Sequence, residues 1–246
     1  MKKTLVCLLL ATIGAVQSFA YESNTMMYTA IPSDLTLKQF EFNVSHKFQG
    51  KIKEDPFDNA FGMHGGASVA IGLRAGLVKG FEIGWQYLFY NREVVYGLMK
   101  NWAVSPILSS RIEISSHRYR PIFYLEDKES TIGGLLAIQV ALLKQKLHGV
   151  VNLHYDGDYE KLGLGLGASY QLTKKIGLMA EFFPRRDKDV ERFDSMVFGL
   201  RWNTYGHRFL FTFGNSRENS LRHVLRGSDT RDFYFGFGLS RLLEID

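Results

Sequence analysis

The sequence has very little cysteine, since Cys7 is the only one among its 246 residues. Cys7 lies inside an N-terminal apolar stretch and away from any cleavage point, so we do not expect the lipid anchor of a lipoprotein. The rest of the chain has no thiol, which excludes cysteine-based zinc and iron–sulfur sites and a cysteine nucleophile. This composition fits export to an oxidising compartment without disulfide bonds.

Long apolar runs and charge of one sign are also scarce. Beyond the N-terminal stretch, no segment approaches the ~20 apolar residues that a transmembrane helix needs. Without Lys2 and Lys3, 28 basic residues stand against 25 acidic ones. The resulting net charge near +3 is not typical of a nucleic-acid-binding protein, and we expect no nucleic-acid partner.

The N-terminal stretch has the pattern of a signal peptide. Lys2 and Lys3 form a basic end, residues 5–16 an apolar core, and Ser18-Phe19-Ala20 a small-x-small cleavage site. The alternative is an uncleaved membrane anchor, but the apolar core is too short to span a bilayer comfortably. We therefore expect an exported protein that is cleaved after Ala20.

The remainder of the chain shows period-two alternation of apolar with small or polar residues. For example, Val69, Ile71 and Leu73 alternate with Gly72 and Arg74. This pattern predicts β-strands with one apolar face, and many segments are near the ~9–11 residues that a tilted strand needs to cross a bilayer. About twelve strands are expected, near residues 37–49, 64–77, 80–90, 93–103, 107–117, 131–145, 147–156, 160–172, 175–184, 193–204, 206–215 and 231–243.

The connections between these segments are sorted by length. Every even-numbered connection is tight, as at Val78-Lys79. The long connections, which are charged, are all odd-numbered: 50–63, 118–130, 185–192 and 216–230. Outer-membrane barrels sort their connections in this way, with short periplasmic turns and longer external loops, whereas a soluble sandwich has no reason to. An even number of strands then puts both termini on the periplasmic side.

The apolar faces could fill the core of a soluble barrel or face lipid. The opposite faces favour lipid, because they combine glycine-rich runs such as Gly163-x-Gly165-x-Gly167 with isolated charges, as expected for a lumen. We therefore predict an all-β protein, a closed antiparallel transmembrane β-barrel of about 12 strands with periplasmic N- and C-termini. Seven residues are predicted to line the lumen: Glu41, Arg74, Glu82, Gln86, Glu181, Arg201 and Arg208. The expected organisation is a signal peptide at 1–20, a periplasmic lead-in at 21–36, the barrel at 37–243 and an overhang at 244–246.

The last third of the chain carries two motifs in order. Thr204-Tyr205-Gly206-His207-Arg208-Phe209 runs into Thr212-Phe213-Gly214-Asn215-Ser216, and Phe235-Gly236-Phe237-Gly238-Leu239-Ser240-Arg241 follows after a loop. These stretches resemble the signatures of an exported β-barrel family known as domain of unknown function 5777. Residues 163–174 and Phe61-Gly62 are also similar to that family, so the resemblance extends from about Tyr28 to Leu242.

The resemblance implies an outer-membrane barrel but no activity, because the family has no assigned function. The chain departs from the family pattern at Tyr205, where the family tends to glycine, at Gly238, where it tends to asparagine, and at its end. The family-signature positions in this chain are Gly206, His207, Asn215, Ser216, Gly236, Ser240 and Arg241. His207 is interpreted as a turn residue that bonds backbone rather than as a ligand.

The connection at residues 216–230 is rich in arginine. Ser220 is expected to cap a short helix that Gly227 ends. One interpretation is an external anion contact, for instance with lipopolysaccharide phosphates. The alternative is a solvated loop with local ion pairs. The candidates for the anion contact are Arg217, Arg222 and Arg226.

No catalytic, cofactor-binding or metal-binding residue is predicted. The leading hypothesis is a passive pore or a binding barrel for small solutes, with the lumen either open or blocked by side chains. The alternatives are a barrel that scaffolds partners through its loops and a lipid-modifying enzyme. The enzyme needs a serine–histidine pair, and none is expected at matching heights on adjacent strands. The expected partners are outer-membrane lipid, lipopolysaccharide and, through the C-terminal strand, the barrel-assembly machinery; no oligomeric state is predicted.

Overall fold

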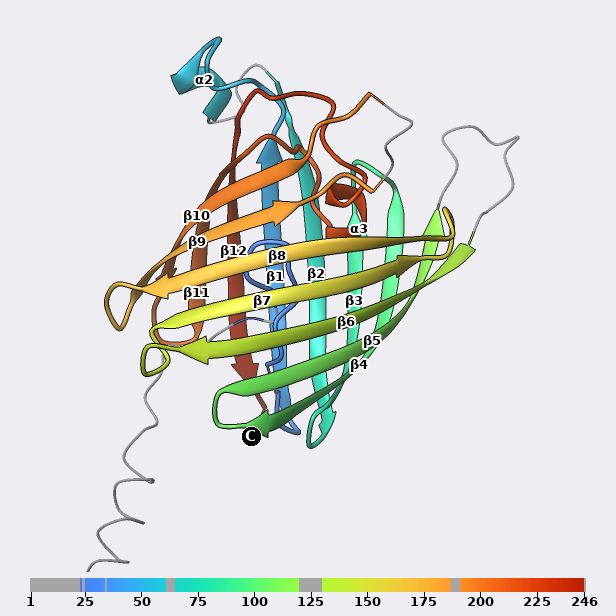
Figure 1. The fold of residues 1–246 in the computed structure, drawn as a ribbon, viewed down its shortest axis with the longest axis vertical. Helices are drawn as coiled ribbons and strands as arrows, with labels where there is room; N and C mark the ends of the chain where they lie inside the picture. The colour runs from blue at the N-terminus through green and yellow to red at the C-terminus, as the bar shows by residue number, and fades with distance from the viewer. Residues whose placement is uncertain are drawn as a thin grey trace, which may run out of the picture.

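The structure is a computed structural model that describes residues 23, 25–33, 35–60, 65–119, 130–186 and 191–245. In this part of the chain, twelve antiparallel strands follow one another around a closed barrel in which β1 is hydrogen-bonded to β12 (Figure 1). The predicted closed antiparallel barrel is therefore confirmed. The predicted signal peptide lies outside the described residues.

The strand boundaries agree with the sequence prediction to within three residues at each end. This agreement includes the fourth and fifth strands, where the alternation is weakest. The strands are β1 (Gln39–Phe48), β2 (Ala67–Val78), β3 (Phe81–Leu88), β4 (Glu93–Ser105), β5 (Leu108–Tyr119), β6 (Ser130–Leu142), β7 (Leu147–Asp156), β8 (Lys161–Gln171), β9 (Ile176–Phe183), β10 (Ser195–Asn203), β11 (His207–Gly214) and β12 (Tyr234–Glu244).

Side chains alternate between the outer and inner surfaces of the barrel along each strand. In β10, Phe198 on the outer surface is 50% exposed, whereas the neighbouring Val197 on the inner surface is 1% exposed. The outer residues are the apolar members of the predicted alternation, and the inner ones include many buried polar residues. Since a soluble barrel would bury the apolar face, this arrangement is that of a membrane barrel.

The last strand closes the barrel against the first. Phe237 and Leu239 point outward, and Tyr234 and Gly236 point inward and are buried, as the alternation predicts. The ladder with β1 extends to Glu244, so the strand uses one residue that the sequence analysis placed in the C-terminal overhang. Closure leaves no strand edge with unpaired backbone groups in the lipid.

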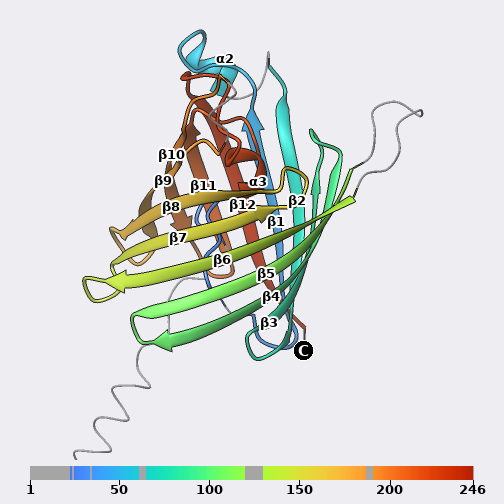
Figure 2. The same ribbon diagram turned by 45° about the vertical axis from the view of Figure 1, so that its right-hand side comes forward.

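Two short helices lie in the long connections, α2 (Pro56–Ala60) between β1 and β2 and α3 (Leu221–Val224) between β11 and β12. Because neighbouring strands are antiparallel, all odd-numbered connections share one end of the barrel, which we call the loop end; the other is the turn end. α2 stands at the loop end, opposite the C-terminus, and α3 folds back among the strands (Figure 1 and Figure 2). Within the described ranges, no helix is long and apolar enough to cross a membrane.

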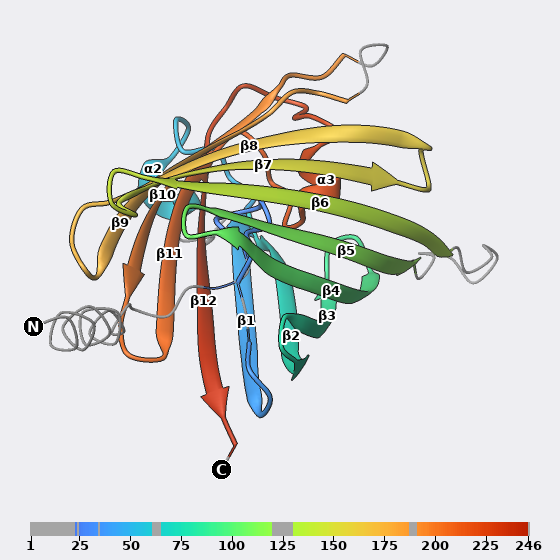
Figure 3. The ribbon, with the colours of Figure 1, turned by 60° about the horizontal axis from the view of Figure 1, so that its bottom comes forward.

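The N-terminal segment is the name we give to residues 23–36, and its described residues up to Leu35 lie inside the barrel, whereas Thr36 is exposed. They were expected outside it, as part of a periplasmic lead-in at 21–36, and the described residues correct this expectation. The start of the described chain, in dark blue, runs within the ring of strands (Figure 3). Met26, Tyr28 and Ile31 are buried, and the nearby carboxylate of Glu181 accepts hydrogen bonds from the backbone of the segment. The polar inner wall supplies partners for backbone groups that a strand or helix would otherwise satisfy.

The register between β1 and β12 generates a testable prediction. Val44 is directly opposite Leu239 and both face outward, so their Cα atoms lie within the ~4.4–6.8 Å that a disulfide needs. A chain with Val44→Cys and Leu239→Cys should form an intramolecular disulfide. On a non-reducing gel, the heat-denatured chain should then migrate differently from its reduced form. Val44→Cys with Leu243→Cys is the control, because Leu243 lies four residues further along β12 and so ~13 Å away. Cross-linking of the control alone would contradict this register.

Candidate functional site

An ion-pair group lies on the inner wall near the turn end. Arg74 Nη2 lies 2.9 Å from Glu41 Oε2, and Arg74 Nη1 lies 2.5 Å from Glu82 Oε2. The three side chains come from the neighbouring strands β1, β2 and β3 and are almost fully buried. A buried charge requires a partner, and here one guanidinium serves two carboxylates.

The same group holds the N-terminal segment. Ser23 Oγ donates to Glu41 Oε1 at 2.8 Å, and the Leu35 backbone N–H donates to Glu82 Oε1 at 2.7 Å. Arg74 Nη1 also donates to Ser33 Oγ at 3.1 Å. The two ends of the segment are therefore tied to one cluster, and the residues between them extend up the lumen.

Glu181 of β9 holds the middle of the segment. Its carboxylate accepts the backbone N–H groups of Met27, Tyr28 and Thr29 at 3.0, 2.9 and 2.9 Å. It also accepts the Thr29 hydroxyl at 2.5 Å. A carboxylate with this many donors is well satisfied although it is buried. Glu181 therefore accepts hydrogen bonds from backbone N–H groups of the N-terminal segment that are not paired with a strand.

Asn152 and Arg208 hold the neighbouring parts of the segment. Asn152 Oδ1 accepts the Ala30 N–H at 2.6 Å and its Nδ2 donates to the Ala30 carbonyl at 2.9 Å, which imitates a step of a strand ladder. The Arg208 guanidinium donates to the carbonyl oxygens of Thr25 and Met26. Glu181 and Arg208 were both predicted to face the lumen, and the structure shows their inner partner, which the sequence did not reveal.

The glycine run of β8 makes room for the inward-folded chain. A Cβ at Gly167 would lie 2.8 Å from Thr29 Oγ1, and one at Gly163 would lie 2.9 Å from a methyl carbon of Leu225. Packing therefore explains the run. Gly163, nearer the loop end, makes room for the residues around α3, and Gly167, nearer the turn end, makes room for the N-terminal segment. Larger residues on this face would push both out of the lumen.

The α3 segment, residues 216–228, enters the lumen from the loop end. Ser220 caps the helix as predicted, since its Oγ accepts the His223 N–H at 3.4 Å, and Gly227 follows with φ +91°, a conformation that favours glycine. Val224 and Leu225 are fully buried. Ser195 of the inner wall donates to the Val224 carbonyl at 3.1 Å.

The two inward-folded segments meet inside the barrel. The Tyr28 hydroxyl donates to the Glu218 carbonyl at 2.7 Å, and Tyr28 belongs to the apolar cluster that contains Val224 and Leu225. Burial, reinforced by the carboxylates of Glu181 and Glu218, raises the pKa of Tyr28 well above its usual value, so the phenol remains a neutral donor. The N-terminal segment, which begins near the turn end, and the α3 segment, which enters from the loop end, are therefore in contact inside the lumen.

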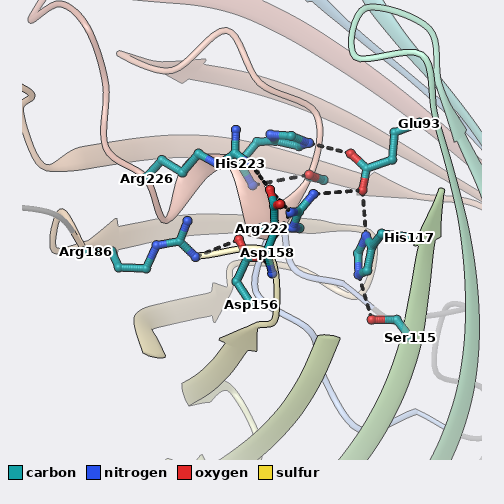
Figure 4. A network of polar contacts seen from close by, with 10 residues as sticks. Glu93, Ser115, His117, Asp156, Asp158, Arg186, Arg222, His223 and Arg226 are labelled. Carbon is teal, nitrogen blue, oxygen red and sulfur yellow. Dashed lines mark hydrogen bonds and ion pairs between the residues drawn. The ribbon is translucent and has the colours of Figure 1, made fainter. Parts of the chain in front are cut away.

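Charged residues from the wall and from α3 form a cluster at the loop end (Figure 4). Glu93 accepts from His117 Nδ1 and His223 Nε2, each at 2.6 Å, and lies 3.3 Å from Arg222 Nη1. Arg222 Nη2 also lies 3.0 Å from Asp156 Oδ1 and 2.9 Å from Asp158 Oδ2. Burial lowers the pKa of Arg222 to about 10, so it remains cationic at neutral pH.

A serine belongs to the same cluster. Ser115 Oγ lies 2.8 Å from His117 Nε2, and both side chains are buried. No serine–histidine pair was expected on adjacent strands, yet Ser169 of β8 is directly opposite His148 of β7, whose ring nitrogens have other partners. The pair of Ser115 and His117 lies on one strand, where Ser-x-His places both side chains on the same face. That spacing is the signal that could have identified it.

A cavity of about 220 Å³ remains between the two inward-folded segments and the inner wall. Of the predicted lumen residues, Gln86, Arg74 and Arg208 border it. Arg201 lies elsewhere on the inner wall, where its Nη2 donates to Gln171 Oε1 at 2.8 Å. The residues that border the cavity and were not predicted include Arg111, Glu113, Ser115, His117, His154 and Arg222.

The three loop arginines do not act together. Arg222 is 2% exposed and points into the lumen, so the structure contradicts its assignment to an external anion contact. Arg226 lies 4.3 Å over the ring of Tyr159. Arg217 is partly exposed and pairs with Asp229 at 2.5 Å, which is the local pairing that the alternative interpretation expected.

The family-signature positions have structural roles. His207 contacts the Tyr205 carbonyl through Nδ1 at 3.4 Å and accepts from Arg241 through Nε2, so it is a turn residue, as predicted. Gly206 precedes it with φ +74°. Asn215 accepts the Met196 N–H at 2.8 Å and so braces the end of β10. Ser216 lies at the loop end, Gly236 on the closing strand and Ser240 in the lumen.

The closed strand ladder, the apolar outer surface and the polar lumen define a membrane-spanning β-barrel. Residues 138–243 match the family model described as "Membrane bound beta barrel domain (DUF5777)". The family resemblance seen in the sequence is therefore confirmed over those residues. No curated protein matches the chain.

Among solved structures, a KdgM porin has 9% sequence identity and a TM-score of 0.58, over 82% of this chain and 98% of the porin. A NanC porin has 8% identity and a TM-score of 0.50, over 84% and 100%. The outer membrane phospholipase A from Escherichia coli has 13% identity and a TM-score of 0.50, over 87% and 95%. At these identities the likeness shows a common fold and does not transfer an activity.

The role of Glu181 can be tested by Glu181→Ala. The variant leaves three backbone N–H groups and a hydroxyl without their acceptor, and each buried orphan donor costs about 1–3 kcal/mol. We expect the N-terminal segment to loosen while the barrel stays folded. With Thr25→Cys as a reporter, a membrane-impermeant thiol reagent should label the Glu181→Ala protein faster by about tenfold or more, since a loss of ~1.4 kcal/mol corresponds to tenfold.

The matched control is Glu244→Ala, which removes an exposed glutamate that contacts Gln39 and not the segment. It should leave the labelling rate of Thr25→Cys unchanged. Equal labelling of the Glu181→Ala protein and the parent would show that Glu181 does not hold the segment in place.

Proposed function

We propose that the protein is an exported outer-membrane barrel that binds small solutes in its lumen and passes them when the two inward-folded segments move. The observation that carries this proposal is the 220 Å³ cavity, which is bordered by the two inward-folded segments as well as by the barrel wall. Both segments are held by hydrogen bonds, ion pairs and limited apolar packing. Such contacts can open without breaking the strand ladder.

Charged and polar side chains among the residues that border the cavity support binding of solutes that carry polar groups. Arg74, Gln86 and Arg208 border it together with Asn43 and Ser45. A lumen of this kind replaces some of the water around a polar solute with fixed donors and acceptors. The function requires no chemical step.

The location follows from three features that support export to an outer membrane. The first twenty residues have the pattern of a cleaved signal peptide. The outer surface of the strands is apolar, and the fold is shared with porins. The short connections at the turn end support a periplasmic position for both termini.

Conductance measurements in planar bilayers test this function. The complete mature protein should give rare, small conductance steps, because the N-terminal and α3 segments lie across the lumen. Deletion of residues 23–36 removes the segment that Glu181, Asn152 and Arg208 hold. The deletion variant should give steps at least several-fold larger, because the remaining α3 segment occupies only the loop end.

Arg217→Ala is the control for this measurement, since the partly exposed Arg217 pairs with Asp229 and does not border the cavity. Its loss should not affect conductance. Folding of each variant is checked by the different gel migration of heated and unheated barrel. A folded deletion variant that gives no conductance steps would rule out the pore function.

A further inference from the structure

Glu93, His117 and Ser115 form a hydrogen-bonded series that solute passage does not require. Ser115 Oγ lies 2.8 Å from His117 Nε2, and His117 Nδ1 lies 2.6 Å from Glu93 Oε1 (Figure 4). This order of hydroxyl, imidazole and carboxylate is that of a nucleophile, its general base and the group that orients the base. Both distances are within the range that such a series needs.

The strand register explains how the three side chains meet. Ser115 and His117 are two residues apart on β5 and so share the inner face. His117 is opposite Val95 on β4, and Glu93 precedes Val95 by two residues, so it shares the inner face next to His117. Across the other side of β5, Gly133 of β6 is opposite Ser115.

Gly133 provides the space that the pair occupies. A Cβ at this position would lie 2.8 Å from Ser115 Oγ and 2.9 Å from His117 Nε2. Any larger residue would therefore displace one of the two reacting groups. Ser115 and His117 both border the 220 Å³ cavity.

We propose that Ser115 is the nucleophile of a site in the lumen that hydrolyses small acyl esters. Ser115 Oγ forms a bond to the ester carbonyl carbon while its proton moves to His117 Nε2. The carbon–oxygen bond to the alcohol then breaks, and the alcohol leaves with that proton. Water, deprotonated by His117, attacks the acyl-serine, and the carboxylic acid and the Ser115 hydroxyl are released.

Glu93 is a positioning residue in this proposal. By accepting from Nδ1, it favours the His117 tautomer whose Nε2 has a free lone pair toward Ser115. Arg222 Nη1 lies 3.3 Å from the same carboxylate oxygen. The α3 segment thus supplies part of the site.

His154 is the candidate for stabilising the negative charge that develops on the carbonyl oxygen. It is 6% exposed and borders the same cavity. Within the described part of the chain, its Nδ1 has no hydrogen-bond partner. In the tautomer that carries the Nδ1 proton, this atom is a buried donor that lacks an acceptor, and an oxyanion is such an acceptor.

The cavity determines the class of substrate. A volume of about 220 Å³ is below the ~300–1,000 Å³ of pockets for drug-sized ligands, which favours a short acyl chain on a small alcohol. Leu135 and Leu221 border the cavity and offer an apolar contact for the acyl group. Ser115 faces the lumen, so an intact membrane phospholipid, whose tails contact the outer surface, is not the substrate.

Covalent labelling of the complete mature protein tests the site. A small alkyl fluorophosphonate bearing a fluorophore should label the folded protein in detergent, and mass spectrometry should locate the adduct on Ser115. Ser115→Ala should abolish labelling. Ser169→Ala is the matched control, because Ser169 is also a buried serine on the inner wall but does not border the cavity, and it should label like the parent.

The partners of Ser115 have distinct expected effects. His117→Ala should slow labelling by about 100-fold or more, as expected for loss of a general base. His154→Phe should slow it by about 100-fold, as expected for loss of an oxyanion donor. Glu93→Gln should slow labelling and also change its pH profile, whereas a residue with a purely structural role would leave the profile unchanged. Hydrolysis of p-nitrophenyl acetate should follow the same order among the variants.

Access to the site is tested separately with the variant that lacks residues 23–36. Labelling of Ser115 in either the complete protein or this folded variant supports the proposal. If neither is labelled beyond its Ser115→Ala counterpart, the proposal is wrong. This outcome is independent of the pore function. A variant that conducts but is not labelled would support the pore and contradict the ester-hydrolysing site. A variant that is labelled but does not conduct would support the site and contradict the pore.

Discussion

The structure depends on one constraint, that every backbone polar group of a membrane-spanning strand has to be paired within the barrel. The β1–β12 ladder meets it by closing the sheet. Closure divides each strand into a lipid face and a lumen face, so apolar side chains such as Phe198 point outward and polar ones gather inside. The polar side chains then need partners of their own, and the inside of the barrel is organised around this need.

The partners come mostly from two segments that fold back into the lumen. The carboxylate of Glu181 and the amide of Asn152 pair with backbone of the N-terminal segment, and Glu93 pairs with α3. Each segment therefore satisfies wall groups and is itself satisfied by them. The glycines of β8 have a complementary role, because their missing side chains leave the space that both segments occupy.

The charged cluster at the loop end holds α3 in place and also contains the serine proposed as a nucleophile. Glu93 braces α3 through His223 and Arg222, and through His117 it orients a serine toward the cavity. Movement of α3 would therefore change the enclosure of the cavity and the environment of Ser115 together. A barrel that admits a small solute and a site that acts on an ester share the same space, so the two functions proposed for this lumen are compatible in geometry.

The sequence by itself determined the strands, their inner faces and the closed barrel. Alternation is a local property with a period of two residues, and the sorted connections record which end each strand reaches. The tertiary structure alone decided what fills the lumen. Arg222 and Glu93 are 129 residues apart, and Thr29 and Glu181 are 152 apart, so no local pattern announces their contacts. The pairing of Ser115 with His117 was visible as spacing, but its link to Glu93 depends on the register of β4 against β5. The turn and the bulge between these two strands set that register, and the alternation of apolar and polar residues does not reveal it.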